Sequence, residues 1–406
     1  MFFCLKSNKI DNYYDKTPES IKLQFTTRNL NKKLFRYIVG NKINAFYQIM
    51  RIYHFLCIGL ISLALTGCKP AVGKEGDLPE ISFFYWKSTF NVKDVSSRWL
   101  DSIPVNKLYI RFFDVDVDVN LGPVPVAPLT GLPEKLPYSL TPVIFITNET
   151  FLKVKEEKGL VDLADKLVGK LLQMSHPHQV KEWLIDCDWS PKTRIPFFNF
   201  CRILNEKARN NHIELMATIR LDQYKNVETT GVPPVKSGLL MAYNMGALAN
   251  WETSNSILNE KDAAVYLQNP KRYPLPLTLG LPFYQWGVVF RDSIFTGLIN
   301  GLDISDLTDS VRFKKTGENT FELSENTFLQ GFYLYEKDKI RIEKVGENEI
   351  LSIIHLLKKW KSVNDNKEIV FFHLDERILD SVNGSFFKYF SQKVSTIKQR
   401  QVKMTD

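Results

Sequence analysis

The sequence predicts a (β/α)8 barrel, and three observations support this fold class. Eight apolar segments recur between residues 81 and 376, and helical patterns separate several of them. The segments are near-continuous hydrophobic runs, as expected of parallel strands that are buried on both faces. Polar side chains gather where these segments end, which is the rim where barrel enzymes hold their sites.

The strands and helices follow from this alternation. The predicted strands are ISFFYW (81–86), VNKLYIRFFDVDVD (105–118), TPVIFIT (141–147), EWLIDCD (182–188), IELMATIR (213–220), SGLLMAYN (237–244), LPLTLGLPFY (275–284) and KEIVFFHLDE (367–376). The predicted helices cover 91–102, 158–174, 193–211, 347–361 and 377–395.

Two connections depart from an ideal barrel. Residues 120–140 are rich in proline and predict an irregular loop. The interval between the seventh and eighth strands contains an alternating stretch, TFELSENTFLQGFYLYEKDKIRIEKV, which is typical of a small antiparallel sheet. We therefore expect the barrel to cover residues 80–290 and 347–395, with a β subdomain inserted at 291–346.

The N-terminal region resembles a bacterial lipoprotein signal. From Met50, a basic start and an apolar stretch lead into Leu-Thr-Gly followed by Cys68. The alternatives are a short buried helix or a membrane anchor, but the apolar stretch is short for a span. We expect residues 1–49 to precede the true start at Met50, residues 50–67 to be the signal peptide, and residues 68–79 to be a linker.

This resemblance implies cleavage before Cys68 and attachment of lipid to its thiol, which would anchor the protein to a membrane. Lys69 follows the cysteine in place of the aspartate of inner-membrane retention, which favours the outer membrane of the cell envelope. The leader also explains the basic charge: residues 1–67 hold 10 Lys+Arg and 3 Asp+Glu, leaving 43 against 42 in the remainder. We expect no nucleic-acid partner.

Metal and cysteine chemistry receive little support. Cys187 and Cys201 are predicted to be buried free thiols, and no His/Cys cluster has the spacing of a zinc site. The alternating Asp114, Asp116 and Asp118 could hold a hard cation, but a solvated strand end is the simpler interpretation. We expect neither a metal nor a cofactor.

The predicted rim is rich in aromatic and hydrogen-bonding side chains, which suits the CH faces and hydroxyls of a sugar. It consists of Tyr85, Trp86, Asp114, Asp116, Asp118, Asn148, Glu149, Asp186, Asp188, Arg220, Asp222, Tyr243, Asn244, Tyr284, Trp286, His373, Asp375 and Glu376.

Three motifs in the right order resemble glycoside hydrolase family 18, the chitinase-like barrels. The fourth strand of that family ends in Asp-x-x-Asp-x-Asp-x-Glu, and IDCDWS supplies Asp186 and Asp188. The sixth strand matches Met-x-Tyr-Asp with MAYN, 241–244, and the seventh matches Gly-x-Pro-x-Tyr with GLPFY, 280–284. The chain also resembles a group of uncharacterised bacterial lipoproteins with a degenerate form of this barrel.

The resemblance implies a mechanism in which the substrate's own acetamido oxygen attacks the anomeric carbon. Asp188 would orient the acetamido group, Tyr243 would contact it, and Asp186 would support Asp188. The departures oppose this chemistry. Ser190 stands at the position of the acid, and a hydroxyl is a poor proton donor near neutral pH. Trp183 replaces the first aspartate, Asn244 replaces another, and the eighth strand lacks its usual tryptophan.

Three functions remain open: a carbohydrate-binding barrel, an active glycoside hydrolase with relocated carboxylates, or a structural or assembly lipoprotein. Whether the protein is an enzyme is therefore uncertain. The expected partner is a glycan, for which an N-acetylhexosamine is one candidate component. The candidate catalytic residues are Asp186, Asp188, Glu149 and Glu376, and the candidate binding residues are Trp86, Asp114, Tyr243, Asn244, Tyr284 and Trp286.

Overall fold

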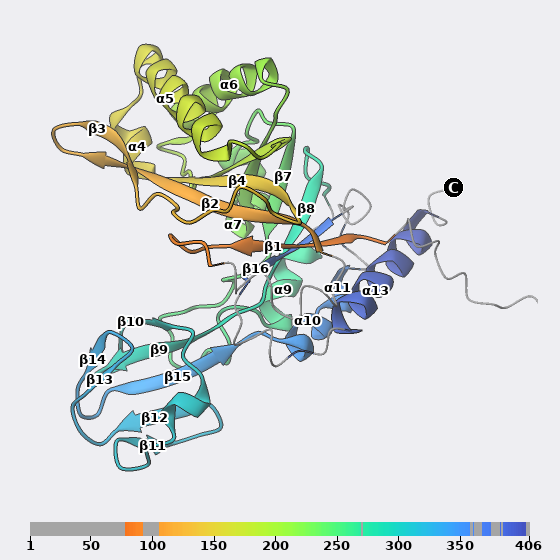
Figure 1. Cartoon of the computed structure of the whole chain (residues 1–406). Helices are drawn as coiled ribbons and strands as arrows, with labels where there is room; N and C mark the ends of the chain where they lie inside the picture. The colour runs from red at the N-terminus through yellow and green to blue at the C-terminus, as the bar shows by residue number, and fades with distance from the viewer. Residues whose placement is uncertain are drawn as a thin grey trace, which may run out of the picture. The chain divides into compact units, whose positions relative to one another are not determined.

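The computed structural model describes residues 78–91, 105–268, 271–357, 360, 368–374, 382 and 385–402. Its main sheet contains eight parallel strands, and β1 pairs with both β2 and β16, so the sheet closes into a barrel (Figure 1). The predicted (β/α)8 fold is confirmed. The barrel strands are β1 (Glu80–Tyr85), β2 (Val105–Asp118), β4 (Ser139–Ile146), β5 (Glu182–Asp186), β6 (Glu214–Arg220), β7 (Ser237–Met241), β8 (Leu277–Pro282) and β16 (Glu368–Phe372).

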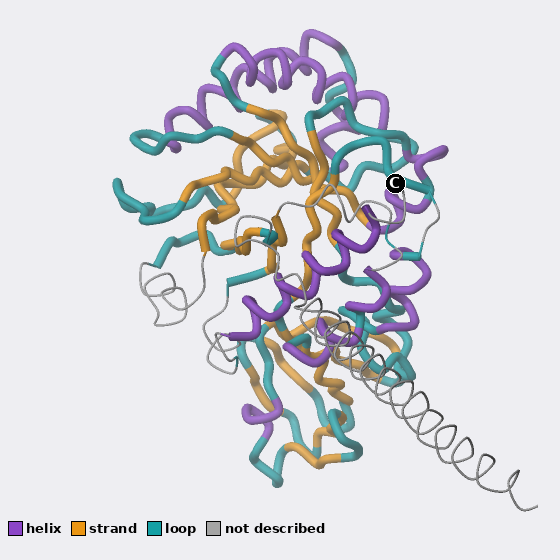
Figure 2. The backbone as a smooth tube through the Cα atoms, turned by 90° about the vertical axis from the view of Figure 1, so that its right-hand side faces the viewer, coloured by secondary structure: helices purple, strands orange, loops and turns teal. Residues whose placement is uncertain are grey.

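Helices cover the outside of the strands (Figure 2). In α5, Leu160, Leu163, Leu167 and Leu171 are buried at helical spacing, so one face of the helix packs inward while its charged face meets solvent. The predicted helix 91–102 and part of 377–395 lie outside the described residues. The helices are α4 (Asn148–Lys153), α5 (Glu157–Ser175), α6 (Arg194–Asn210), α7 (Leu221–Lys225), α8 (Val227–Thr230), α9 (Glu260–Leu267), η2 (Ile304–Leu307), α10 (Glu347–Ser352), α11 (Ile354–Leu357) and α13 (Ser385–Val402).

The proline-rich segment is more regular than the sequence predicts. It contains strand β3 (Gly122–Val126), which runs antiparallel along the C-terminal half of β2. Pro123 and Pro125 fit there because β3 is an edge strand, where a residue without an N–H is tolerated. The two strands form a ribbon at the upper left of Figure 1.

The insertion between β8 and β16 is an antiparallel sheet, as predicted. Its strand order is β10-β9-β15-β12-β11, and a separate hairpin pairs β13 with β14. The sheet begins at Gln285, earlier than the expected boundary of 291, because the chain passes from β8 to β9 through two residues only. The strands are β9 (Gln285–Arg291), β10 (Ile294–Asn300), β11 (Phe313–Lys315), β12 (Thr320–Leu323), β13 (Thr327–Leu329), β14 (Phe332–Leu334) and β15 (Lys339–Lys344).

The N-terminal ends of the barrel strands are closed by a polar cluster. Lys107 Nζ lies 2.9 Å from Glu182 Oε2 and 3.2 Å from Glu368 Oε2. The Tyr109 hydroxyl donates to Glu368 Oε2 at 2.8 Å. The ammonium and the two carboxylates satisfy one another, so this end of the barrel is closed and serves stability.

Candidate functional site

A cavity of about 620 Å³ opens at the C-terminal ends of the barrel strands. Two sources supply its walls: the strand ends of the barrel, and the inserted sheet through β9 and the end of β10. The lining residues are Trp86, Asp114, Phe145, Asp186, Arg220, Met241, Tyr243, Asn244, Tyr284, Gln285, Trp286, Asn300, Gly301, Phe372 and His373.

Aromatic rings form much of this wall. Tyr243 stacks on Phe372, with ring centroids 5.4 Å apart and an interplanar angle of 24°. Tyr284 meets Phe372 edge-on at 5.7 Å and lies 5.3 Å from Trp286. Trp86 also packs against Phe372, at 5.7 Å. The rings hold one another in place, which gives the cavity rigid apolar faces.

Asp186 is buried at the cavity floor, with 4% of its surface exposed. Burial raises the pKa of its carboxyl group from 3.8 to about 6, against the opposing effects of Arg220 and of a hydrogen bond from Thr218. Thr218 Oγ1 donates that bond to Asp186 Oδ1 at 2.6 Å. The carboxyl group can therefore exchange a proton near neutral pH.

Asp188 forms an ion pair with Arg220, whose guanidinium lines the cavity. The carboxylates of Asp188 and Asp186 raise the pKa of Arg220 against the effect of burial. Arg220 ends β6 and Asp188 follows β5, the neighbouring strand, so the parallel register brings the two charges together. The predicted pair Asp186 and Asp188 thus shares one cation.

Asp114 lines the cavity and is held by Arg111, three residues earlier on β2. Arg111 Nε and Nη2 donate to the two carboxylate oxygens at 2.8 and 2.7 Å. The other two aspartates of this strand have structural partners: Asp116 Oδ1 accepts from Thr147 Oγ1 at 2.9 Å, and Asp118 accepts from the backbone of the β2–β3 turn. Within the described ranges, no group of acidic, histidine or cysteine side chains could hold a metal ion.

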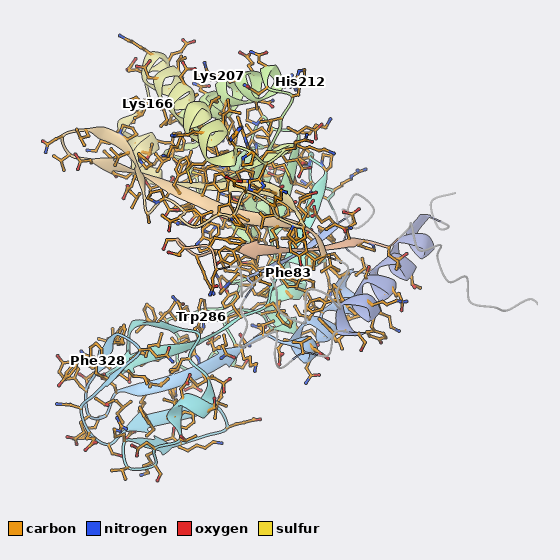
Figure 3. The ribbon with its side chains drawn as sticks, viewed as in Figure 1. Phe83, Lys166, Lys207, His212, Trp286 and Phe328 are labelled. Carbon is orange, nitrogen blue, oxygen red and sulfur yellow. The ribbon has the colours of Figure 1, made fainter. Side chains whose placement is uncertain are left out.

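Two hydrogen bonds fix the wall beside the inserted sheet. The Tyr284 hydroxyl donates to Asn244 Oδ1 at 2.5 Å, and Asn244 has a φ of 54°, which asparagine tolerates better than most residues. Trp286 Nε1 donates to Glu343 Oε2 at 2.9 Å. Because its N–H is used in this way, Trp286, labelled in Figure 3, presents only apolar ring surface to the cavity.

Glu343 belongs to a buried network that anchors this wall. Its Oε1 accepts from Arg341 Nε at 2.8 Å, and its Oε2 accepts from Ser256 Oγ at 2.6 Å. Arg341 also donates to the carbonyl oxygens of Asn250 and Trp251 at 2.7 and 2.8 Å. The network ties the inserted sheet to the loop that follows β7.

Ser190, which the sequence resemblance placed at the position of an acid, is not among the residues that line the cavity. Its carbonyl accepts from the backbone N–H groups of Thr193 and Arg194, at 3.0 and 2.8 Å, at the start of α6. Its own N–H donates to Thr193 Oγ1 at 2.9 Å. The residue therefore serves the turn that leads into α6.

Glu149 is not brought to the cavity. It lies in the first turn of α4 with half of its side chain exposed, and it pairs with Lys153 at 3.6 Å on the solvent face. Thr150 and Phe151 occupy the buried face of this short helix, so helical geometry turns Glu149 outward.

Glu376 lies outside the described residues, as do Cys68 and the whole leader. Among the described helices, none has the length and apolarity to cross a membrane.

Several cavity residues are not among the predicted binding residues. Arg220 ends β6 and His373 directly follows β16, so their place at strand ends is the sequence signal that puts both in the predicted rim. Gln285, Asn300 and Gly301 carry no sequence signal, because they reach the cavity only through the pairing of β9 with β10. Trp86, Asp114, Tyr243, Asn244, Tyr284 and Trp286 all line it, together with Asp186.

The fold and the position of the cavity define the class as a (β/α)8 barrel with an inserted antiparallel sheet and a cavity at the C-terminal ends of its strands. None of the family models matches this sequence, and no curated protein matches it. Solved structures are similar in fold. The C-terminal domain of a putative chitinase from Desulfitobacterium hafniense is 12% identical with a TM-score of 0.49, and the alignment covers 78% of this chain and 99% of that one.

Two further structures are similar to a comparable degree. The Group IV chitinase of Ostrinia furnacalis is 11% identical with a TM-score of 0.48, covering 79% of this chain and all of that one. The chitinase-like agglutinin of Robinia pseudoacacia is 13% identical with a TM-score of 0.45, covering 78% and 99%. At these identities the likeness concerns the fold alone.

Proposed function

We propose that this chain is a carbohydrate-binding barrel of the bacterial cell envelope, anchored by lipid on Cys68, that does not use family-18 acid catalysis. The cavity is the observation that carries the proposal. It combines rigid aromatic faces with a small number of polar groups, which is the composition expected for a sugar site. An N-acetylhexosamine oligomer is the first ligand to test.

Two observations support the absence of family-18 catalysis. Ser190 stands where the acid belongs and is bound into the start of α6. In addition, Asp188 and Asp114 are each paired with a guanidinium group, so neither carboxylate is free to act on a ligand in place of that acid.

One observation favours the second candidate function, a glycoside hydrolase. Asp186 is a buried carboxyl group with a pKa raised to about 6, a property shared with catalytic acids. A hydrolase would still need a second group to stabilise the developing cation or to activate water. Asp188, beside it, would take that role only if the ion pair with Arg220 opens.

Calorimetric titration with N-acetylglucosamine tetramer, within a wider glycan panel, tests the binding function. Replacing Trp86 with Ala removes one aromatic face, and we expect affinity to fall about tenfold. Trp86→Phe should retain most of the affinity. The matched control is Phe328→Ala in β13, a residue that is 66% exposed and not among the cavity residues. Figure 3 labels it apart from Trp286. Equal binding by Trp86→Ala and wild type would remove the cavity as the sugar site.

Hydrolysis of the same panel separates the two candidate functions. Turnover that disappears in Asp186→Asn would favour the hydrolase, whereas binding without turnover favours the binding barrel. Ser190→Glu restores the acid in sequence, and a gain of hydrolysis on N-acetylglucosamine oligomers would show that the rest of the family's site is functional. If the panel gives neither binding nor turnover, the structural or assembly role gains.

The lipid anchor is tested separately. Full-length protein expressed in a bacterium should incorporate labelled palmitate and begin at Cys68, as read by mass spectrometry. Cys68→Ala should abolish both the label and the cleavage, and fractionation of the wild-type protein tests the outer-membrane location. A mature chain that begins elsewhere and carries no label would contradict the anchor.

A further inference from the structure

The inserted sheet contributes one complete side of the cavity. Gln285 and Trp286 begin β9, and Asn300 and Gly301 stand at the end of β10, paired with them. The register is fixed by backbone bonds: Asn300 pairs with Trp286, and Gly301 N donates to Gln285 O at 3.0 Å. This side is therefore built on sheet, which holds side chains in fixed positions.

The side chain of Gln285 is 4% exposed and only half satisfied. Its Nε2 donates to Gly301 O at 3.3 Å, which fixes the orientation of the amide. Its Oε1 has no hydrogen-bond partner among the described residues. A buried acceptor without a donor is costly, and native proteins keep few of them outside functional sites.

The neighbouring wall, at the end of the adjacent strand β7, holds a second such group. The hydroxyl of Tyr243, which is 5% exposed, also lacks a partner among the residues that the structure describes. Two buried polar groups without partners thus belong to walls of one cavity, one on the barrel and one on the inserted sheet. A ligand with several hydroxyl groups could satisfy both at once, because each hydroxyl donates and accepts.

We propose that Gln285 is a ligand-binding residue of a second sugar subsite, on the inserted-sheet side of the cavity. Gln285 Oε1 accepts a hydrogen bond from a hydroxyl or amide N–H of the sugar. The apolar ring surface of Trp286 lies beside it, and the exposed amide of Asn300 stands at the mouth. The subsite rests on the proposed sugar-binding function and names the part of the cavity that sets specificity.

Gln285→Met tests this subsite, because methionine keeps the length of the side chain and removes the acceptor. The probes are N-acetylglucosamine tetramer and glucose tetramer, titrated calorimetrically into full-length mature protein. We expect affinity for the tighter-binding probe to fall about fivefold to tenfold. The melting temperature of the unliganded variant should change little, because the substitution removes the unsatisfied acceptor together with the long bond from Nε2 to Gly301 O. Gln268→Met, at the exposed end of α9, is the matched control.

Asn300→Ala provides a second variant at an exposed position where folding is not at risk, and we expect it to weaken binding about twofold to fivefold. Wild-type affinity in both variants would overturn the subsite while leaving the sugar-binding function intact. Weaker binding by Gln285→Met together with a lower melting temperature, and wild-type binding by Asn300→Ala, would also overturn it, as a purely structural effect. If the wild-type protein binds neither probe, the proposed function fails for these sugars and the subsite with it.

Discussion

Asp186 should make the folded protein less stable as the pH rises from 4 to 7. Burial raises the pKa of its carboxyl group from 3.8 to about 6. Between these values the folded protein binds a proton that the unfolded chain has released, so stability decreases with rising pH. A pKa difference of about 2 corresponds to about 3 kcal/mol of unfolding free energy, which is completely lost above pH 6.

Asp186→Asn removes the free-energy cost of ionising the buried carboxyl group. The amide keeps an oxygen that can accept the hydrogen bond from Thr218. Urea unfolding of both proteins at a series of pH values gives the difference in unfolding free energy, in which all other titrating groups cancel. We expect this difference to move in favour of the variant by about 2.4 kcal/mol between pH 4 and pH 7, because part of the effect already lies below pH 4.

A difference that stays constant with pH, or that moves against the variant, would refute the reasoning. The control is Asp162→Asn, which makes the same change of side chain at an exposed position on α5. Retention of a carboxyl group that destabilises the protein at neutral pH would fit a functional role for Asp186, since sites often carry such costs.

Three further predictions concern stability and reactivity. Glu343→Gln leaves the guanidinium of Arg341 buried without its carboxylate, so unfolding free energy should fall by about 3–5 kcal/mol in urea titration. Lys107→Met leaves the carboxylates of Glu182 and Glu368 without their cation, so unfolding free energy at pH 7 should fall by about 3 kcal/mol. Burial raises the pKa of the thiols of Cys187 and Cys201, so neither should react with a disulfide reagent at pH 8 until the protein unfolds.

Each of these has an outcome that contradicts it. Wild-type stability of Glu343→Gln would mean that the network is not maintained in solution. Wild-type stability of Lys107→Met would mean that the ammonium does not stabilise the two carboxylates at this end of the barrel. Thiol reaction faster than global unfolding would show that α6 or the end of β5 opens locally.

Much of the barrel could be predicted because parallel strands buried on both faces leave long apolar runs in the sequence. The same geometry places the strand ends at one rim, so the sequence alone assigns Trp86, Tyr243 and Tyr284 to a common pocket, and all three line the cavity. The serine at position 190, where the resemblance to family 18 would place a glutamate, is also a property of the sequence. The lipid anchor on Cys68 remains a prediction.

Only the tertiary structure decided how these side chains are paired. Arg220 meets Asp188 because β5 and β6 are adjacent in parallel register, whereas Glu149 is turned away by the first turn of α4. Gln285 reaches the cavity because β8 continues directly into the inserted sheet. The periodicity of a sequence fixes which residues share a face, but partners from different elements are fixed by strand register and helix rotation, which local sequence does not encode.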